Sequence, residues 1–477
     1  MAWSQLEPSG PHLTYLTVPI FLLTYALFSL FIRNRLHLSE PPLATLFGIL
    51  FGPKCAGVLR PEQWGFTDDV IQEITRLIVG IQCFAVGLEL PNDYFKNTWR
   101  SLTMLLGPVM AFGWIVCAAF VYWIFETDIP TALIISACLT PTDPVLAASV
   151  LSNSQFSERV PLRLRLLLSA ESGCNDGVSF PFLYVGISIL TSATVGGIFK
   201  KWLLIHILYQ CGVGIILGLF LGHAANRLFR FSNNRKIVCR ASYLVFYLLL
   251  AIFSIGAAST LGVDDFLVAF GAGVGFGHAG NSPIREKNLP VVIDLLLNST
   301  FFVFFGALIP WHAFTAGSDL VGITPGKLVG LIVLVLVFRR LPIVLALYRW
   351  MPAIKTFNEA LFTGHFGPMG VGALFLVMEA RAQLETDASI PLPHPPHNLP
   401  ETKKRAVLLV WPVVCAVVLA SVMVHGLSTL AISVVGHLAR DEGERAPLIG
   451  AETDGLGGMV HEDSDEEVDE RYENGSV

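Results

Sequence analysis

Two short strings inside apolar stretches combine carboxylates with residues that interrupt helices. The string TPTDP covers residues 140–144, and the string ESGCNDG covers residues 171–177. An ionisable side chain near the middle of a membrane span costs roughly 3 kcal/mol on insertion scales, so it marks a functional site by default. Asp143 and Asp176 are therefore candidates for binding a cation or a proton within a membrane.

The residues around Asp176 can supply further oxygen ligands. Ser172 and Asp176 are four residues apart and share one face of a helix, and Asn175 lies close to that face. Hard cations such as Na⁺ prefer oxygen ligands, and the prolines beside Asp143 leave carbonyl groups free to join them. The alternative is that Asp176 only hydrogen-bonds a neighbouring helix, but two acids in adjacent spans favour an ion site.

A buried positive charge is expected to balance one of the acids. Glu171 lies about 100° around the helix from Ser172, so it faces away from the ion site. Arg339 and Arg340 lie near the centre of another apolar stretch, and a buried arginine needs a partner. We expect an ion pair between Glu171 and Arg340, with Arg339 as an accessory residue. The alternative places both arginines at a helix end, reaching the lipid head groups.

Five further titratable residues have weaker signals. Asp264 and Asp265 fall at a short break, where they could attract cations to an external entrance or simply favour a helix N-terminus. His365 lies in a glycine-rich stretch and could sense or relay protons, although a lone histidine is more often structural. Glu89 and Glu379 close apolar stretches, and we expect them at the membrane interface.

Composition predicts an all-α polytopic membrane protein. Of the 477 residues 53% are hydrophobic and 14% are charged, against about 25% charged in soluble domains. Stretches long enough to span a bilayer number about thirteen: 13–31, 41–59, 70–90, 101–125, 130–151, 163–190, 202–222, 242–262, 265–280, 290–312, 327–350, 357–380 and 406–437. We expect a bilayer around the chain and no nucleic-acid partner.

Charge places the two ends of the chain. Basic residues are more frequent in the loops after odd-numbered stretches, so those loops are expected in the cytoplasm. The N-terminus is then outside and the C-terminus cytoplasmic. We divide the chain into a transporter domain, 1–440, and an acidic, disordered tail, 441–477.

Two of the predicted spans are interrupted. Pro141 and Pro144 break the stretch 130–151, and glycines with Pro368 break the stretch 357–380. The two stretches are seven spans apart and cross the membrane in opposite senses. Paired interruptions of this kind predict an inverted repeat with the binding site between its halves.

These motifs together resemble the monovalent cation:proton antiporter superfamily, on its Na⁺/H⁺ exchanger branch, and most of all the fungal plasma-membrane Na⁺/H⁺ antiporters. The resemblance rests on TDP at 142–144, ESGCND at 171–176, RRLP at 339–342 and HFGPMGVG at 365–372, in order over residues 13–437. It implies a homodimer in which a core domain carrying two crossing broken helices moves against a dimerisation domain.

The resemblance also implies roles for the site residues. Asp176 binds Na⁺ or H⁺ in turn, assisted by Asp143, Ser172 and the backbone of Thr142. Asn175 stands where electrogenic bacterial relatives carry an acid, which implies electroneutral one-for-one exchange. The expected function is exchange of Na⁺, or of Li⁺ or K⁺, for H⁺ by alternating access, for salt tolerance and pH homeostasis.

Three other functions compete with this interpretation. A cation channel would also use acids and carbonyls, but without coupling to protons. An intramembrane aspartyl protease would use two acids that share a proton, yet the chain has no Gly-x-Gly-Asp string. A receptor does not account for two acids in mid-membrane. We expect a transporter and not an enzyme, with no cofactor beyond the transported ions.

Overall fold

The chain folds into helices. The computed structural model describes residues 9–151, 160–191, 194–277, 288–315, 322–393, 399–428 and 430, and these residues contain no strand. The first half contains α1 (Gly10–Asn34), α2 (Glu40–Phe51), η2 (Pro61–Trp64), α3 (Asp68–Glu89), α4 (Tyr94–Met104), η3 (Leu105–Val109), α5 (Met110–Phe125), α6 (Ile129–Cys138), α7 (Pro144–Leu151) and α9 (Leu162–Thr191). The second half contains α10 (Val195–Lys201), η4 (Trp202–Val213), α11 (Gly214–Asn234), α12 (Arg240–Leu261), α13 (Asp265–Gly277), α14 (Asn288–Leu308), α15 (Trp311–Thr315), α16 (Pro325–Phe338), α17 (Leu341–Leu347), η5 (Tyr348–Trp350), α18 (Phe357–His365), α19 (Val371–Thr386) and α20 (Glu401–Gly426).

The helices have the lengths and composition of a membrane protein. Among the described residues, six helical stretches are long and apolar enough to cross a bilayer: α1, α3, α4 through α5, α10 through α11, α16 through η5, and α20. Each of the thirteen predicted apolar stretches overlaps at least one helix. The all-helical membrane fold is therefore confirmed, whereas thirteen as the number of spans stays a prediction. The predicted tail, 441–477, lies outside the described residues.

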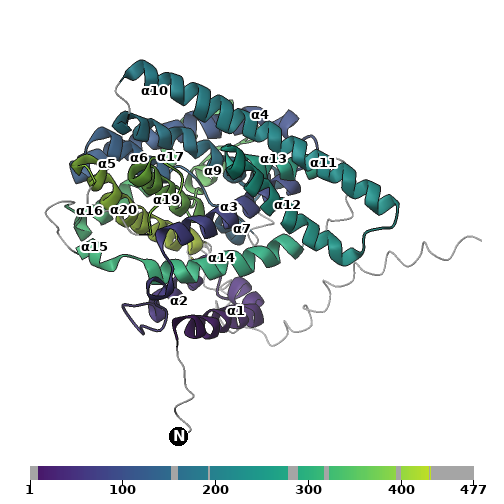
Figure 1. Cartoon of the computed structure of the whole chain (residues 1–477), viewed down its shortest axis with the longest axis horizontal. Helices are drawn as coiled ribbons and strands as arrows, with labels where there is room; N and C mark the ends of the chain where they lie inside the picture. The colour runs from purple at the N-terminus through teal and green to yellow at the C-terminus, as the bar shows by residue number, and fades with distance from the viewer. Residues whose placement is uncertain are drawn as a thin grey trace, which may run out of the picture.

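The helices at the edges expose apolar side chains, whereas those at the centre bury polar ones. Figure 1 shows α10 and α11 along one edge of the molecule and α1 at the opposite edge. Leu27 of α1 and Phe220 of α11 are exposed, as lipid-facing side chains would be. Asp143, Glu171 and Asp176 are buried instead. The centre of the bundle is thus the polar part of the spans.

Both predicted interruptions are present, and they lie against each other. The first helix stops at Cys138 and resumes at Pro144, and the second stops at His365 and resumes at Val371. Proline has no N–H to continue a helix, and Pro144 takes the first helical position, where none is needed. The Asp143 N–H donates to the Pro368 carbonyl at 2.8 Å, which joins one interruption to the other.

The glycine-rich helix α13 is enclosed on two sides. α13 packs against α3 and α11. A Cβ at Gly222 of α11 would lie 2.0 Å from the Ala272 carbonyl oxygen, and one at Gly273 of α13 would lie 2.1 Å from the Phe84 carbonyl oxygen of α3. Small residues let helix backbones approach closely within membranes. The close packing fixes α3 and α13 around the buried acids.

Candidate functional site

Asp143 lies where two helices begin. Its Oδ1 accepts hydrogen bonds from the N–H groups of Val145 and Leu146, both at 2.9 Å, and its Oδ2 accepts from the Val371 N–H at 3.2 Å. The first two donors open α7 and the third opens α19. Helix N-termini carry partial positive charge, so one carboxylate stabilises both half-helices.

Arg339 stabilises the C-terminal ends of the two half-helices that precede the interruptions, α6 and α18. Its guanidinium donates to the carbonyl oxygens of Leu139, just after α6, and Gly367, just after α18. The C-termini of helices carry unpaired carbonyls and partial negative charge, which a guanidinium stabilises. Asp143 and Arg339 together balance all four half-helix ends where the broken helices α6–α7 and α18–α19 meet, which we call the crossing. The sequence identified Arg339 as an accessory residue but did not assign this contact.

Three residues of the predicted cation shell hold the first interruption against α9. Asn175 Oδ1 accepts from the Thr142 N–H at 3.1 Å, and Asn175 Nδ2 donates to Thr142 Oγ1 at 2.7 Å. Thr142 Oγ1 and Ser172 Oγ lie 2.8 Å apart. The structure therefore brings Thr142, Ser172 and Asn175 together, and in it they bind one another.

Asp176 differs from these neighbours because one of its oxygens is unused. The side chain is 2% exposed. Its Oδ2 lies 3.9 Å from the Cys83 sulfur of α3, at the limit of a weak thiol hydrogen bond. Its Oδ1 has no hydrogen-bond partner. A buried carboxylate oxygen without a partner is costly, so it calls for a proton or a cation.

Two glycines let both acids reach the start of α19. A Cβ at Gly370 would lie 2.0 Å from Asp143 Oδ2, and a Cβ at Gly372 would lie 2.0 Å from Asp176 Oδ1. Neither position has space for any side chain. Both glycines belong to the string HFGPMGVG at 365–372. Its glycines predicted an interrupted helix, but not a contact with Asp143 or Asp176.

Glu171 and Arg340 form the expected ion pair. Arg340 Nη1 contacts Glu171 Oε1, and Arg340 Nη2 donates to Glu171 Oε2 at 2.7 Å. The Arg340 side chain is 8% exposed and also donates through Nε to the Thr363 carbonyl at 2.9 Å. The alternative in which the arginines reach lipid head groups is therefore wrong.

A small cavity lies on the same side of the crossing as this pair. It is lined by Thr140, Asn175, Glu171, Arg339, Arg340 and apolar residues of η3 and α5. η3 is a π-helical turn that contains Pro108. Such bulges are frequent at functional sites because they displace the backbone locally.

The accessory acids are deeper than predicted. Asp264 and Asp265 are each 4% exposed, not open at an entrance. Asp264 Oδ1 caps α13 by accepting from the N–H groups of Phe266 and Leu267, while Oδ2 has no partner. Asp265 contacts Arg76. The expectation that they favour a helix N-terminus is met by Asp264.

The structure also places Glu379 and His365. Glu379 is 2% exposed, so protein surrounds it, and its expected place at the membrane interface stays a prediction. His365 ends α18 and is exposed, with Nε2 at 3.4 Å from Ser428 Oγ. His425, which no sequence pattern identified, contacts the same segment: its Nε2 lies 3.0 Å from the His365 carbonyl oxygen.

A crossing of two broken helices beside a buried, unpaired carboxylate is the architecture of ion-coupled secondary transporters. Residues 21–434 match the family described as "Sodium/hydrogen exchanger, transmembrane", and the chain belongs to this family.

Known proteins agree with this assignment. The chain is 42% identical to a probable Na⁺/H⁺ antiporter of Schizosaccharomyces pombe over 91% of its length, and 42% identical to Na⁺/H⁺ antiporter 2 of Zygosaccharomyces rouxii over 91%. It covers only 58% and 54% of those two relatives. The solved sodium proton antiporter MjNhaP1 of Methanocaldococcus jannaschii shares the fold, with a TM-score of 0.63 and 17% identity, over 90% of this chain and 98% of that one.

Proposed function

We propose that the protein is a secondary antiporter that exchanges Na⁺ for H⁺. The observation that carries this proposal is the free, buried Oδ1 of Asp176 beside the crossing. The named activities of the fungal relatives support the same function. The proposal needs no cofactor besides the transported ions and no enzymatic step.

Competition for one carboxylate explains the coupling. Asp176 carries H⁺ when protonated and binds Na⁺, or Li⁺ or K⁺, when ionised. Both loaded forms are neutral, whereas the empty carboxylate would cross the apolar interior as a bare charge, which is costly. Alternating access with only the loaded forms moving then exchanges one cation for one proton, and the exchange is electroneutral.

We propose different roles for the residues around Asp176. Besides Asp176, we propose Asp143 and Ser172 as oxygen ligands of the cation, together with the carbonyls of the interruption. Asn175 and Thr142 already bond to each other through side chain and backbone, so we propose that they position the interruption and join the shell only through remaining lone pairs. Glu171 and Arg340 form a structural ion pair.

The setting of the transporter is part of the proposal. Loop charge supports an external N-terminus and a cytoplasmic C-terminus. We propose a homodimer in the plasma membrane, with a role in salt tolerance and pH homeostasis. The named activity of the fungal relatives, Na⁺/H⁺ antiport, supports Na⁺ as a transported cation.

The contacts of Asp143 argue against the protease alternative. Two acids that share a proton must bring their oxygens together. Asp143 instead uses both oxygens to accept backbone N–H groups. A channel remains the alternative that transport measurements must separate.

The decisive experiment uses purified protein in liposomes with a trapped pH dye. An inward Na⁺ gradient should make the lumen alkaline, with and without a membrane potential clamped by K⁺ and valinomycin. Asp176→Asn should abolish this signal while leaving the fold and the yield of the protein unchanged, because an amide can neither ionise nor carry the proton. Na⁺ uptake without proton movement would identify a channel, and a rate that follows the imposed voltage would exclude one-for-one exchange.

A further inference from the structure

A second group of buried charges lies away from the crossing, between α3 and α19. On α3, Asp68, Gln72 and Arg76 are spaced four residues apart and therefore share one face. On α19, their partners are Arg381, Glu379 and Phe375. We call these six residues the α3–α19 seam.

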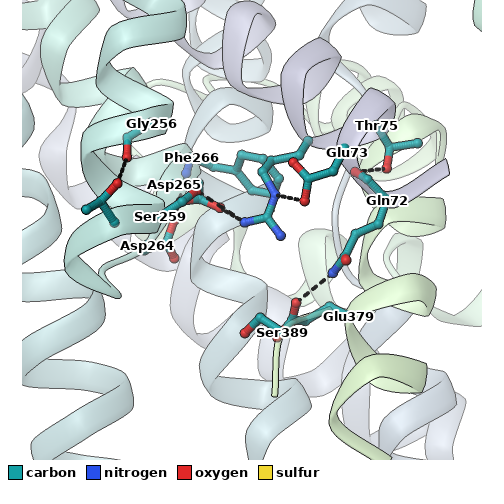
Figure 2. Close-up of polar contacts among 12 residues, drawn as sticks. Gln72, Glu73, Thr75, Gly256, Ser259, Asp264, Asp265, Phe266, Glu379 and Ser389 are labelled. Carbon is teal, nitrogen blue, oxygen red and sulfur yellow. Dashed lines mark hydrogen bonds and ion pairs between the residues drawn. The ribbon is translucent and has the colours of Figure 1, made fainter. Parts of the chain in front are cut away.

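Each pair in the seam is a direct contact. Arg381 Nη2 lies 2.7 Å from Asp68 Oδ2, and their side chains are 6% and 16% exposed. Gln72 Nε2 donates to Glu379 Oε2 at 3.0 Å, as Figure 2 shows. The guanidinium of Arg76 lies 5.2 Å from the centre of the Phe375 ring, a cation–π distance.

The seam leads to Asp176. Cys83 of α3 and Gly372 of α19 both contact that residue. Arg76 precedes Cys83 by seven residues, which is about 10 Å along a helix, and Asp68 precedes it by fifteen, or about 22 Å. Both helices therefore run from the surroundings of Asp176 to the seam.

The seam lies on the opposite side of Asp176 from the small cavity. Along α9, Glu171 lines the cavity and precedes Asp176, whereas Tyr184 follows it. The Tyr184 hydroxyl donates to Glu379 Oε1 at 2.9 Å, in the seam. The loop charges predict that the seam end faces outward.

The polar composition of this contact is compatible with an interface between helices that opens. Replacing buried ion pairs by apolar residues is often neutral or stabilising, so a fixed contact gains little from them. Polar groups that bond to one another when closed can bond to water when open, which lowers the cost of separating the helices. The seam is suited to an interface that opens.

The surroundings of the seam are acidic. Arg76 also contacts Glu73 and Asp265, and Arg381 also lies 3.5 Å from Glu385. Figure 2 shows Glu73 and Asp265 beside the seam. With Asp68 and Glu379, five carboxylates face two guanidinium groups. Water entering between α3 and α19 would therefore meet a net negative wall, which concentrates cations.

We propose that the α3–α19 seam is the gate on this side of the site and that, once open, its carboxylates line the route by which cations reach Asp176. The proposal rests on the proposed exchange activity, because a gate is needed only if Asp176 is exposed to the two sides in turn.

Reversible cross-linking of the seam tests the gate. In a chain whose eight cysteines have been replaced and whose exchange is intact, Gln72→Cys is combined with Glu379→Cys. Oxidation should form a disulfide between α3 and α19 and reduce Na⁺-driven proton movement in liposomes at least about tenfold, and a reductant should restore it.

A second cysteine pair that also includes a residue of α3 serves as the control, because any disulfide on α3 restrains that helix. Gln82 of α3 donates to Asn298 of α14 at 3.3 Å, so Gln82→Cys with Asn298→Cys ties α3 to a different neighbour through another buried glutamine contact. This disulfide should leave exchange within about twofold of the reduced protein. Mass spectrometry verifies both cross-links.

The two proposals fail in different ways. Exchange that continues in the oxidised Gln72–Glu379 pair as in its control would overturn the gate while leaving the antiporter in place. Absence of Na⁺-driven proton movement from the unaltered chain would contradict the exchange function itself. If the inner pair does not fold, Asp68→Cys with Arg381→Cys places the same cross-link at the outer end of the seam.

Discussion

At the scale of single residues, the acids in this protein are distinguished by what their oxygens contact. Asp143 has three backbone N–H partners, and Glu171 has a guanidinium, whereas Asp176 Oδ1 has none. A carboxylate whose oxygens already accept several hydrogen bonds gains less from a cation than a carboxylate with an unpaired oxygen. Among these three acids, Asp176 is therefore the one that we propose exchanges the ions.

Gly372 provides a test of how tightly that oxygen is enclosed. Gly372→Ala would put a Cβ 2.0 Å from Asp176 Oδ1, so either the acid or α19 must move. We expect exchange to fall at least about tenfold in the liposome assay. Gly330→Ala on α16 is the control, because a Cβ there meets nothing within 4 Å. Equal activity of the two variants would contradict the tight enclosure.

At the scale of elements, the crossing is stable because each broken helix end has a partner. Asp143 serves the two N-termini and Arg339 serves the two C-termini. The ion pair of Glu171 and Arg340 fixes the arginine-bearing segment to α9. The interruption thus keeps a defined geometry although its backbone is not helical.

The ion pair should be visible as coupling between its members. Arg340→Ala should lower the free energy of unfolding by about 3–5 kcal/mol, because it leaves Glu171 charged and buried. Adding Glu171→Gln should restore part of the loss, since the amide carries no charge. Unfolding of both single variants and the double variant in mixed detergent micelles measures this cycle. Losses that simply add would mean that the two residues do not interact.

At the scale of the whole molecule, the buried acids lie at the centre of the bundle and the exposed apolar side chains lie on the helices at its edges. The buried acids lie on α7, α9, α13 and α19 or at their ends, whereas α1 and α11 expose apolar side chains. The acidic segment 441–477 is remote in sequence from every residue of the crossing. Transport should therefore depend on the helices alone.

Removal of the segment tests that separation. A chain that ends after Arg440 should keep Na⁺-driven proton movement within about twofold of the full chain, measured in the same liposomes at equal protein density. A larger loss in correctly inserted protein would assign the segment a part in transport.

Sequence alone determined the broad features because they depend on local chemistry. Apolar length defines helices in a membrane, prolines and glycines interrupt them, and carboxylates within such stretches mark a site. These rules predicted both interruptions, the acids Asp143 and Asp176, and the partner of Glu171.

Only the tertiary structure decided how the site residues divide their roles. Whether an oxygen is free depends on neighbours that are distant along the chain: Asn175 is occupied by Thr142, Asp143 by Val371, and Glu379 by Gln72. The wheel of a single helix shows which face a residue shares, but not what packs against that face. For the same reason Glu379 and Asp265 looked peripheral in the sequence and are buried in the fold, where contacts between α3, α13 and α19 replace water.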